Sequence, residues 1–569
     1  MIVTNPGKRP REFLFLCYTV LMLEKFQLKK DKKTLETYST DASIFRIVPS
    51  GVFAPRDKGE LLEFVKEIIR LKKENPKSDI SITGRAAGTC MSGGSLTDQY
   101  IISFTDHFNK IIKIDKEAKT VTLEPGVYYR DMEKETLKKG LILPSYPASR
   151  ELCAIGGMIG NNAAGEKTFK YGKTDKYIEE IEMICADGNI YNFKELAGDQ
   201  LNDVLENDKT FYGDIHRAVY SLIQHNESEI NRSKPTVTKN SSGYYIWNVY
   251  DKDRHAMNLA KLICGSQGTF GVMTQFTLKL IEAEKKSKMA VVFLNNINDM
   301  PKVVSRISPL MPESFEVFDD HTFRIAMKFL PQIVKRLGGS IFSLIKLFWP
   351  EFKMVITGNI PKIVMLIEFV EKDRTTINKK EKELKKVFED FESDENIKTH
   401  IVESEAEAKK YWVFRRESFN LLRSKLKDVR TVPFIEDVVV HSDDLSDFLP
   451  RFEAILDEAN LVYTIAGHVG DGNIHVIPLM KLSDENSVGE IKSISDRVYS
   501  LVAEYNGSLS GEHNDGLIRA PFLHYMYGEK MLNIFKDIKN AFDPQGIFNP
   551  HKKIDVSWDY SKDRIDRRK

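Results

Sequence analysis

At 569 residues, the chain is too long for one ordinary domain, and its length predicts about three folded units. Lysine plus arginine number 83 and aspartate plus glutamate 82, so bulk charge supplies no attraction to nucleic acid or to an acidic partner. The five cysteines include no C-x-x-C pair, which argues against zinc–thiolate sites, iron–sulphur clusters and a disulfide framework and favours a reducing cytoplasm.

Residues 1–37 are predicted to be an N-terminal extension. They contain a basic flank and an apolar run from Phe13 to Leu23. This run is shorter than the roughly 20 residues that a spanning helix needs, and no small-residue cleavage site follows it. The alternative is an interfacial anchor. We therefore expect a cytoplasmic protein, with peripheral contact at the inner face of the membrane as the second placement.

The next stretch mixes helices and strands. Residues 60–74 place Leu62, Val65 and Ile69 at helical spacing, and residues 79–84 then alternate as a strand that leads into a glycine-rich loop. Further strands are predicted at 99–104, 119–126 and 179–188, and a helix at 129–141 with a glycine stop at Gly140. An α+β class follows, with antiparallel pieces.

The second half has a different character. Glycine-rich loops end near residue 284, and charge runs with a helix-then-strand rhythm continue, which places another α+β domain at 284–500. The most apolar run, 329–356, is interrupted by charged residues and a proline, so we expect a core or partner-facing helix, with an amphipathic surface against a membrane as the alternative. A segment at 501–556 and a charged, frayed tail at 557–569 complete the chain.

The first glycine-rich loop follows the strand at 79–84. Glycines at this spacing allow close backbone approach, so successive N–H groups can face a pyrophosphate. The loop matches neither G-x-G-x-x-G nor the Walker lysine loop, and a structural turn is the alternative. The candidate cofactor-binding residues of this loop are Gly84, Arg85, Ala86, Gly88, Thr89, Cys90, Met91, Ser92, Gly93 and Gly94.

Two further glycine-rich loops lie in the same half, at 147–188 and 264–280. Small residues beside paired asparagines suit a planar ligand that lies against the backbone. Three such loops together favour a dinucleotide more strongly than any one does. The candidates are Pro147, Ser149, Gly156, Gly157, Asn161, Asn162, Gly165 and Gly172 in the second loop and Gly271 and Val272 in the third.

Taken together, these loops resemble the FAD-binding domain of the vanillyl-alcohol oxidase (PCMH) type, with "GSQGTFGV" standing where that family has "GSEGTLGV". The second half resembles the C-terminal domain of FAD-linked oxidases such as D-lactate dehydrogenases, glycolate oxidase flavin subunits and D-2-hydroxyglutarate dehydrogenases. The resemblance implies a two-subdomain FAD-binding domain at 38–283, a ferredoxin-like substrate or cap domain at 284–500, and a segment at 501–556 that returns to the flavin. It also implies non-covalent FAD and a flavin-side role for Asn549, for which a helix-stop turn is the alternative.

The stretch "GHVGDGNIH", residues 467–475, carries two candidate metal ligands. Its glycines allow a sharp turn, so the imidazoles of His468 and His475 can converge; buried core histidines are the alternative. The resemblance makes Glu512 of "SGEHNDG" the third ligand and His513 the catalytic base. Zinc is the expected metal, and manganese or iron would also accept this ligand set.

This set of residues predicts oxidation of a D-2-hydroxy acid. The metal would bind the substrate hydroxyl and carboxylate, His513 would take the hydroxyl proton, and the C2 hydride would pass to flavin N5. The resemblance places a substrate arginine in a W-x-x-R stretch, which is Arg415 in this sequence, with Arg416 as the alternative. Two readings from other classes are a zinc-dependent hydrolase and a catalytically silent flavoprotein subunit.

Departures from the family pattern restrict which substrate class and which electron acceptor we expect. Ile477, Ile435 and Phe419 stand where D-2-hydroxyglutarate dehydrogenases have polar residues, so a second buried carboxylate would lack a partner. A monocarboxylate such as D-lactate, or a larger apolar 2-hydroxy acid, is therefore favoured, and D-2-hydroxyglutarate or glycolate is the alternative. "EHNDGLIR" resembles the variant in long relatives that add an iron–sulphur segment. This sequence does not contain the cysteines of that segment, so we expect a separate electron acceptor: a quinone, an iron–sulphur subunit or a carrier protein.

Overall fold

The structure is a computed structural model that describes residues 18–568 except 20, 284–285, 329–348, 350–358 and 426–428. Residues 1–17 of the predicted extension and nearly all of the apolar run at 329–356 lie outside this set, so their proposed membrane contacts remain predictions. Within the described ranges, no helix is long and apolar enough to cross a membrane.

The first sheet is parallel and holds the strand that leads into the first glycine loop. Its order is β1-β3-β2, and α3 packs against it through buried apolar side chains. The side chain of Asp57 caps α3 by accepting from the backbone N–H of Glu60. The elements are α2 (Lys32–Tyr38), β1 (Gly51–Phe53), α3 (Lys58–Glu74), β2 (Ile82–Arg85) and β3 (Tyr100–Ser103).

The second sheet has seven strands in the order β4-β5-β11-β7-β8-β10-β9, and the pairs between them are antiparallel. Side chains along β11 alternate between buried and half-buried, as expected for a strand with one face in the core. The strands are β4 (Ile111–Asp115), β5 (Thr120–Leu123), β7 (Ile178–Ile184), β8 (Ile190–Ala197), β9 (Tyr250–Asp251), β10 (Ala256–Asn258) and β11 (Val272–Lys279).

Short helices and a small two-stranded sheet surround the second sheet. Helix α4 ends just before Gly140, whose φ is +76°, as its sequence predicts. The helices are α4 (Tyr129–Leu137), α5 (Ile155–Asn161), α6 (Thr168–Tyr171), α7 (Asp199–Glu206), α8 (Phe211–His225), α9 (Glu227–Arg232) and α10 (Leu259–Ile263), and the small sheet pairs β6 (Leu141–Ile142) with β12 (Ile281–Glu282).

The third sheet has eight antiparallel strands in the order β16-β13-β15-β14-β19-β20-β17, with β18 also paired to β20. Its strands are β13 (Lys286–Leu294), β14 (Ser314–Asp319), β15 (Ile363–Glu371), β16 (Ile397–Ile401), β17 (Arg430–Thr431), β18 (Val438–Val439), β19 (Val462–His468) and β20 (Asn473–Met480). Its helices are α11 (Met300–Ile307), α12 (Asp320–Lys328), α15 (Arg374–Glu389), α16 (Glu405–Lys425) and α17 (Leu445–Glu458).

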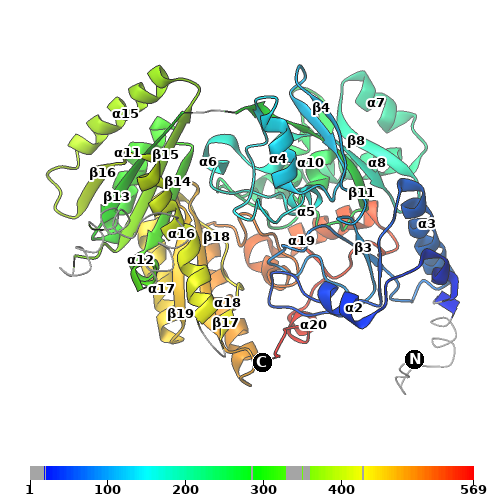
Figure 1. Cartoon of the computed structure of the whole chain (residues 1–569). Helices are drawn as coiled ribbons and strands as arrows, with labels where there is room; N and C mark the ends of the chain where they lie inside the picture. Colours follow the sequence, from blue (N-terminus) through cyan, green and yellow to red (C-terminus); the bar gives the residue numbers. More distant parts are fainter. Residues whose placement is uncertain are drawn as a thin grey trace.

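The C-terminal segment returns from the third sheet to the N-terminal half. After α18 (Ser487–Glu504), a buried loop leads to α19 (Leu523–Phe542), which lies among the elements of the N-terminal half in Figure 1. Phe548 then forms a parallel bridge with Ile82 of β2. One end of the chain therefore closes on the strand that carries the first glycine loop, and the predicted α+β class is confirmed.

The last described residues correct one expectation. The charged tail is not frayed: it forms α20 (Trp558–Lys562), and Ile565 then bridges to Phe45. The carboxylate of Asp566 pairs with Arg430, 3.2 Å from Nη1. Charge alone misled the prediction, because the tail pairs its charged groups with distant residues.

Candidate active site

One cavity of about 690 Å³ collects most of the predicted site residues from both halves of the chain. Its wall includes Gly84, Ala86, Gly88, Thr89, Cys90, Met91 and Gly94 of the first loop, Pro147, Ser149, Gly156, Gly157 and Asn161 of the second, Gly271 and Val272 of the third, and Arg415, His468, His475, Glu512 and His513. The other predicted residues, Arg85, Ser92, Gly93, Asn162, Gly165, Gly172 and Asn549, lie off this wall.

Glycine is required at several points of these loops. Gly88 has a φ of +69°, and a Cβ there would meet the guanidinium of Arg85, which itself donates to the carbonyl oxygens of Tyr38 and Thr40. Gly165 has space for no side chain, because a Cβ would collide with the carbonyl oxygen of Tyr146. Arg85 and Gly165 thus support the loop shape from behind the wall.

Asn549 joins two of the loops. Its side-chain amide donates to the carbonyl oxygens of Gly94 at 2.8 Å and Gln267 at 2.7 Å, and its Oδ1 accepts from the hydroxyl of Thr83 at 2.9 Å. The residue is 1% exposed, with a φ of +42°. Its predicted contact with flavin stays a prediction, but its amide clearly holds the first and third loops together.

The two histidines come from a tight β hairpin. His468 ends β19, a one-turn 3-10 helix (η7, Val469–Asp471) follows, and His475 lies near the start of β20. Gly472 makes the turn with a φ of +68°. The imidazole rings end up 5.1 Å apart between their centres.

Replacing Gly472 with alanine should destabilise this hairpin. The new Cβ would force a left-handed conformation on a non-glycine residue and collide with the carbonyl oxygen of Val440. We expect the free energy of unfolding, followed by urea denaturation, to fall by about 3 kcal/mol. Gly489→Ala is the matched control: it lies within α18 with open space around it, and alanine should raise stability by about 0.5 kcal/mol. Equal stability of the two variants would contradict the steric argument.

The atoms of His468, His475 and Glu512 that could bind a metal lie within 4.8 Å of one another. His468 Nε2 is 2.9 Å from Glu512 Oε1. His475 Nδ1 donates to the carbonyl oxygen of Glu436 at 3.0 Å, so its Nε2 carries a lone pair. Burial lowers the pKa of His475 to about 4, which keeps the ring neutral as a metal ligand must be.

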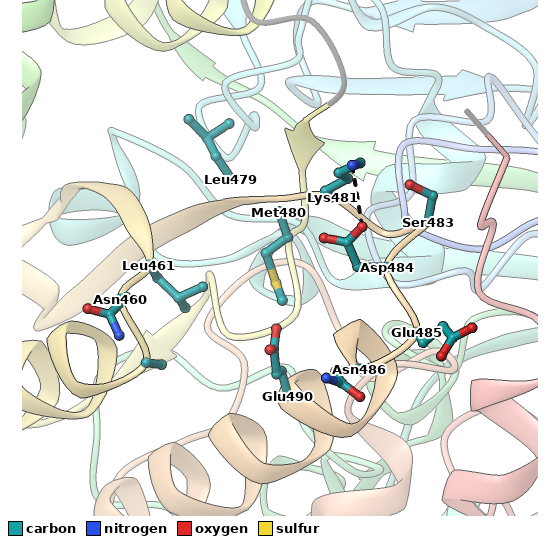
Figure 2. Close-up of a pocket in the computed structure, with 11 residues that line it drawn as sticks. Asn460, Leu461, Leu479, Met480, Lys481, Ser483, Asp484, Glu485, Asn486 and Glu490 are labelled. Atoms are coloured by element: carbon teal, nitrogen blue, oxygen red, sulfur yellow. Dashed lines mark ion pairs between the residues drawn. The ribbon is translucent and has the colours of Figure 1, made fainter.

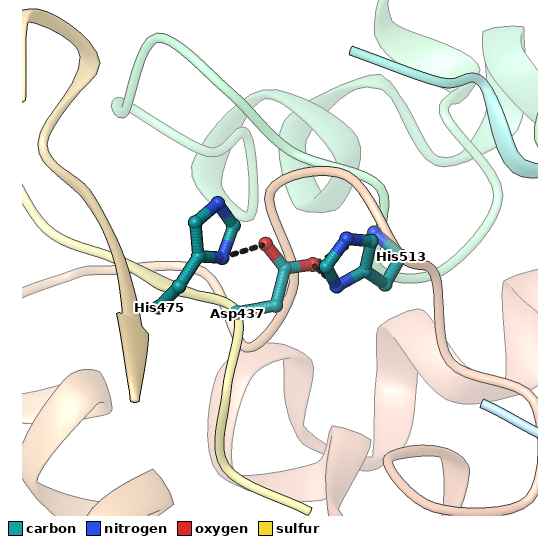
Figure 3. A group of neighbouring side chains, drawn as sticks. All are labelled: Asp437, His475 and His513. Atoms are coloured by element: carbon teal, nitrogen blue, oxygen red, sulfur yellow. Dashed lines mark hydrogen bonds and ion pairs between the residues drawn. The ribbon is translucent and has the colours of Figure 1, made fainter. Parts of the chain in front are cut away.

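Asp437 belongs to a second group of potential ligands, with His475 and His513, and lies between their two rings (Figure 3). Its oxygens are already occupied. They accept from the backbone N–H groups of Glu512 at 2.9 Å and His513 at 2.7 Å, from the Ser510 hydroxyl at 2.6 Å, and from the Asn473 amide at 3.1 Å. Asp437 therefore shapes the loop that presents Glu512 and His513, and the first group fits a metal better.

His513 has the contacts of an oriented base. Its Nδ1 is 2.9 Å from Glu436 Oε1, and the other oxygen of Glu436 pairs with the buried Arg519. Burial lowers the pKa of His513, and Asp437 and Glu436 raise it by more, to about 9. Because Nδ1 is engaged by Glu436, Nε2 is the nitrogen left to exchange a proton with a ligand.

Two buried charged residues complete the surroundings of His468. Glu316 of β14 contacts His468 Nδ1 with one oxygen and lies 3.2 Å from Arg415 Nη2 with the other. Arg415 Nε is buried and has no hydrogen-bond partner among the described residues. Lys239 Nζ lies 2.8 Å from Glu512 Oε1 and 3.2 Å from Asp471 Oδ2.

Sequence reasoning missed Glu316, Lys239, Glu436 and Asp437. Two of them left a readable signal, since "PFIEDVVV" sets adjacent acids inside an apolar run. The alternative to Arg415, the side chain of Arg416, lies outside the described set, as does that of Phe419. Of the other two apolar departures, Ile477 lines the cavity, whereas Ile435 is fully buried away from it.

A second hollow of about 530 Å³ lies at the far end of β20 (Figure 2). Residues from the end of β20, the start of α18 and the turn between them line it, including Met480, Asp484 and Glu490. No histidine, cysteine or glycine-rich loop is among its described lining residues. The chemistry of the chain therefore concentrates in the first cavity.

Two family models match the chain. The model described as an FAD binding domain matches residues 49–194, and the model described as the C-terminal domain of FAD linked oxidases matches residues 283–553. The first match contains the first and second loops. The second contains both histidines, Glu512, His513 and Arg415.

Curated relatives extend over nearly all of the chain. It is 26% identical over 532 residues to D-2-hydroxyglutarate dehydrogenase of Escherichia coli (strain K12). The aligned residues cover 91% of this chain and 49% of that protein. It is also 26% identical over 556 residues to D-lactate dehydrogenase of Anaerostipes hadrus, covering 95% and 98%. The chain thus spans about half the length of the first relative and nearly all of the second.

A solved structure shows the same fold. The structure of p-cresol methylhydroxylase with substrate bound matches with a TM-score of 0.65 and 14% identity, over 97% of this chain and 98% of that one. At this identity the likeness concerns the fold alone. The predicted PCMH-type architecture is confirmed.

Proposed function

Because this chain belongs to the FAD-linked oxidoreductases in which an FAD binding domain precedes the C-terminal domain of FAD linked oxidases, we propose that it oxidises a D-2-hydroxy acid to the 2-oxo acid. One observation carries the proposal: His468, His475, Glu512, His513 and Arg415 line the same cavity as the three glycine loops. The titratable side chains and the glycine-rich loops therefore line the same cavity.

The glycine loops fit non-covalent FAD. Gly88 and Gly94 bring backbone close to the cavity, and a Cβ at either position would strike a neighbouring side chain. Bound there, FAD would accept the hydride from substrate C2 at flavin N5. The loop around Gly156 and Asn161 would hold the ring system, and the backbone of the first loop would hold the pyrophosphate.

The ligand group fits a divalent cation. His475 presents a neutral ring, and His468 and Glu512 are already in contact on the same side of the cavity. Zinc, or alternatively manganese or iron, would lower the pKa of the substrate hydroxyl bound to it. Its charge would also oppose the rise in the pKa of His513 that Asp437 and Glu436 cause.

Two residues would act on the substrate directly. His513 would remove the hydroxyl proton through Nε2, since Glu436 engages Nδ1. Arg415 would bind the carboxylate, because its buried Nε has no partner among the described residues and Nη2 is already held by Glu316. Together they would orient the C2 hydrogen for transfer.

The cavity favours a monocarboxylate such as D-lactate. Arg415 is the only arginine or lysine among its described lining residues, and Ile477 faces the same space beside Thr464. A second buried carboxylate without a cationic partner would cost several kcal/mol. D-2-hydroxyglutarate or glycolate is the alternative. The relative named D-2-hydroxyglutarate dehydrogenase and the relative named D-lactate dehydrogenase are each 26% identical to this chain.

A panel of hydroxy acids tests the proposal. Purified protein mixed anaerobically with D-lactate should lose its yellow colour as the flavin is reduced, whereas L-lactate should leave it oxidised. D-2-hydroxyglutarate should react more slowly than D-lactate, by at least about tenfold, if its distal carboxylate is unpaired. A protein that never holds flavin would overturn the proposal and favour a zinc hydrolase. Flavin that no hydroxy acid reduces would favour a silent subunit.

Electrons must leave the reduced flavin for an acceptor. We propose a quinone, an iron–sulphur subunit or a carrier protein as this acceptor, because the five cysteines of the printed sequence include no C-x-x-C pair of the kind that binds an iron–sulphur cluster. Turnover with quinone analogues, compared with turnover with protein carriers, would separate these acceptors.

A further inference from the structure

Glu316 stands behind the wall of the cavity but contacts two residues that line it. It lies on β14 directly opposite His468 of β19, in register, so the two side chains share one face of the sheet. The side chain is 2% exposed. One carboxylate oxygen contacts His468 Nδ1, and the other lies 3.2 Å from Arg415 Nη2.

These contacts form a continuous chain across the site. Arg415 pairs with Glu316, Glu316 engages His468 Nδ1, and His468 Nε2 faces Glu512 Oε1 at 2.9 Å. Glu316 thereby links the residue that would bind the substrate carboxylate to a residue that would bind the metal. A single buried carboxylate therefore contacts both of the groups that would hold the same small molecule.

We propose that Glu316 is a positioning residue that sets the ring orientation of His468 and the place of the Arg415 guanidinium together. This inference rests on the proposed function and adds to it the residue that aligns the two ends of the substrate site. A carboxylate on the far nitrogen of a metal-binding histidine fixes its orientation and strengthens it as a ligand. Because the same carboxylate pairs with Nη2 of Arg415, the other N–H donors of the guanidinium are left for the substrate.

Glu316→Gln tests the assignment with nearly unchanged volume. Glutamine keeps one acceptor, which cannot serve both His468 and Arg415, and its amide repels the guanidinium donors. With FAD bound and no hydroxy acid present, we expect Zn²⁺ affinity, measured by chelator competition, to fall about 10- to 100-fold. We also expect KM for the best hydroxy acid to rise about tenfold or more, with FAD content unchanged.

Glu313→Gln is the matched control. Glu313 lies just before β14, is also 2% exposed, and uses its carboxylate on Lys167 and on the hydroxyl of Tyr171, away from the histidines. We expect this variant to lose thermal stability while Zn²⁺ affinity and KM stay at wild-type values. Glu316→Asp supplies a second test if Glu316→Gln fails to fold: it keeps the charge but shortens the reach, and we expect about a tenfold loss of Zn²⁺ affinity.

The outcomes separate this inference from the proposed function. Wild-type protein that holds FAD but binds no Zn²⁺, Mn²⁺ or Fe²⁺ would overturn the metal site itself. Wild-type protein that binds Zn²⁺, with Glu316→Gln or Glu316→Asp binding it equally well at an unchanged KM, would overturn only the positioning role. Equal losses in Glu313→Gln would also overturn it, because the effect would then follow from the loss of any buried acid in or beside β14.

Discussion

Replacing His513 with alanine should nearly abolish reduction of the bound flavin by the hydroxy acid, lowering the rate about 100- to 10,000-fold. In the structure, Nδ1 of His513 lies 2.9 Å from Glu436 Oε1, so Nε2 is the nitrogen that would accept the proton in the proposed reaction. Alanine removes this acceptor and supplies no other. Stopped-flow measurement of flavin absorbance under anaerobic conditions would give the rate.

FAD content should remain unchanged in this variant, because the glycine loops that would hold the cofactor do not depend on the imidazole. Added imidazole should restore part of the rate if the missing group is a base. His441→Ala serves as the control, since His441 is exposed and lies next to the short 3-10 helix η6 (Ser442–Asp444). Normal flavin reduction by His513→Ala would refute the assignment of the base.

Removing the proposed metal should have an effect of similar size. Treatment with a chelator should lower the rate of flavin reduction about 100-fold or more, since loss of the cation removes several kcal/mol of stabilisation of the developing alkoxide. Zn²⁺ or Mn²⁺ should restore the rate, and FAD should stay bound throughout. Metal content measured by elemental analysis should follow activity through both steps.

His475→Ala should reproduce the effect of the chelator without its reversal by added metal. The variant loses one of the three proposed metal ligands, whereas His524→Ala removes an exposed histidine of α19 and should leave metal content unchanged. A chelated protein that reduces its flavin at the normal rate would show that the histidine pair has another role, such as packing of the hairpin.

Several segments of the site were predictable because each segment carries its own signal in the local sequence. The turn between His468 and His475 is local, and the required glycine at Gly472 can be read directly from "GHVGDGNIH". The glycine loops are equally local. Each of these segments carries its conformational requirement in its own residues, so no knowledge of distant contacts is needed.

Glu316 and Lys239 could not be predicted in the same way. Glu316 acts through cross-strand pairing with a residue more than a hundred positions later, and Lys239 through ion pairs with Asp471 and Glu512. Their surroundings in sequence contain no partner of opposite charge at a suggestive spacing. Register and burial, which only the folded chain defines, decide what they contact.

The fold shows the same division between local and distant information. Helix α3 and strands β2, β3, β5 and β7 followed from local periodicity. The tail at 557–568 was misjudged because its charges find partners at Arg430 and its backbone pairs near Phe45. Ile435 and Ile477 illustrate the limit for side chains: both are isoleucines at departures from the family pattern, yet only one faces the cavity.

The amide of Asn549 also has a consequence for the order of events during synthesis. It contacts Thr83, 466 residues earlier, and links the loops of Gly94 and Gln267. A nascent chain that has left the ribosome as far as residue 283 already contains all three glycine loops but not the group that ties them together. Since domains fold largely in the order in which they emerge, we expect the N-terminal half to assemble early and to gain tight cofactor retention only when the final stretch arrives.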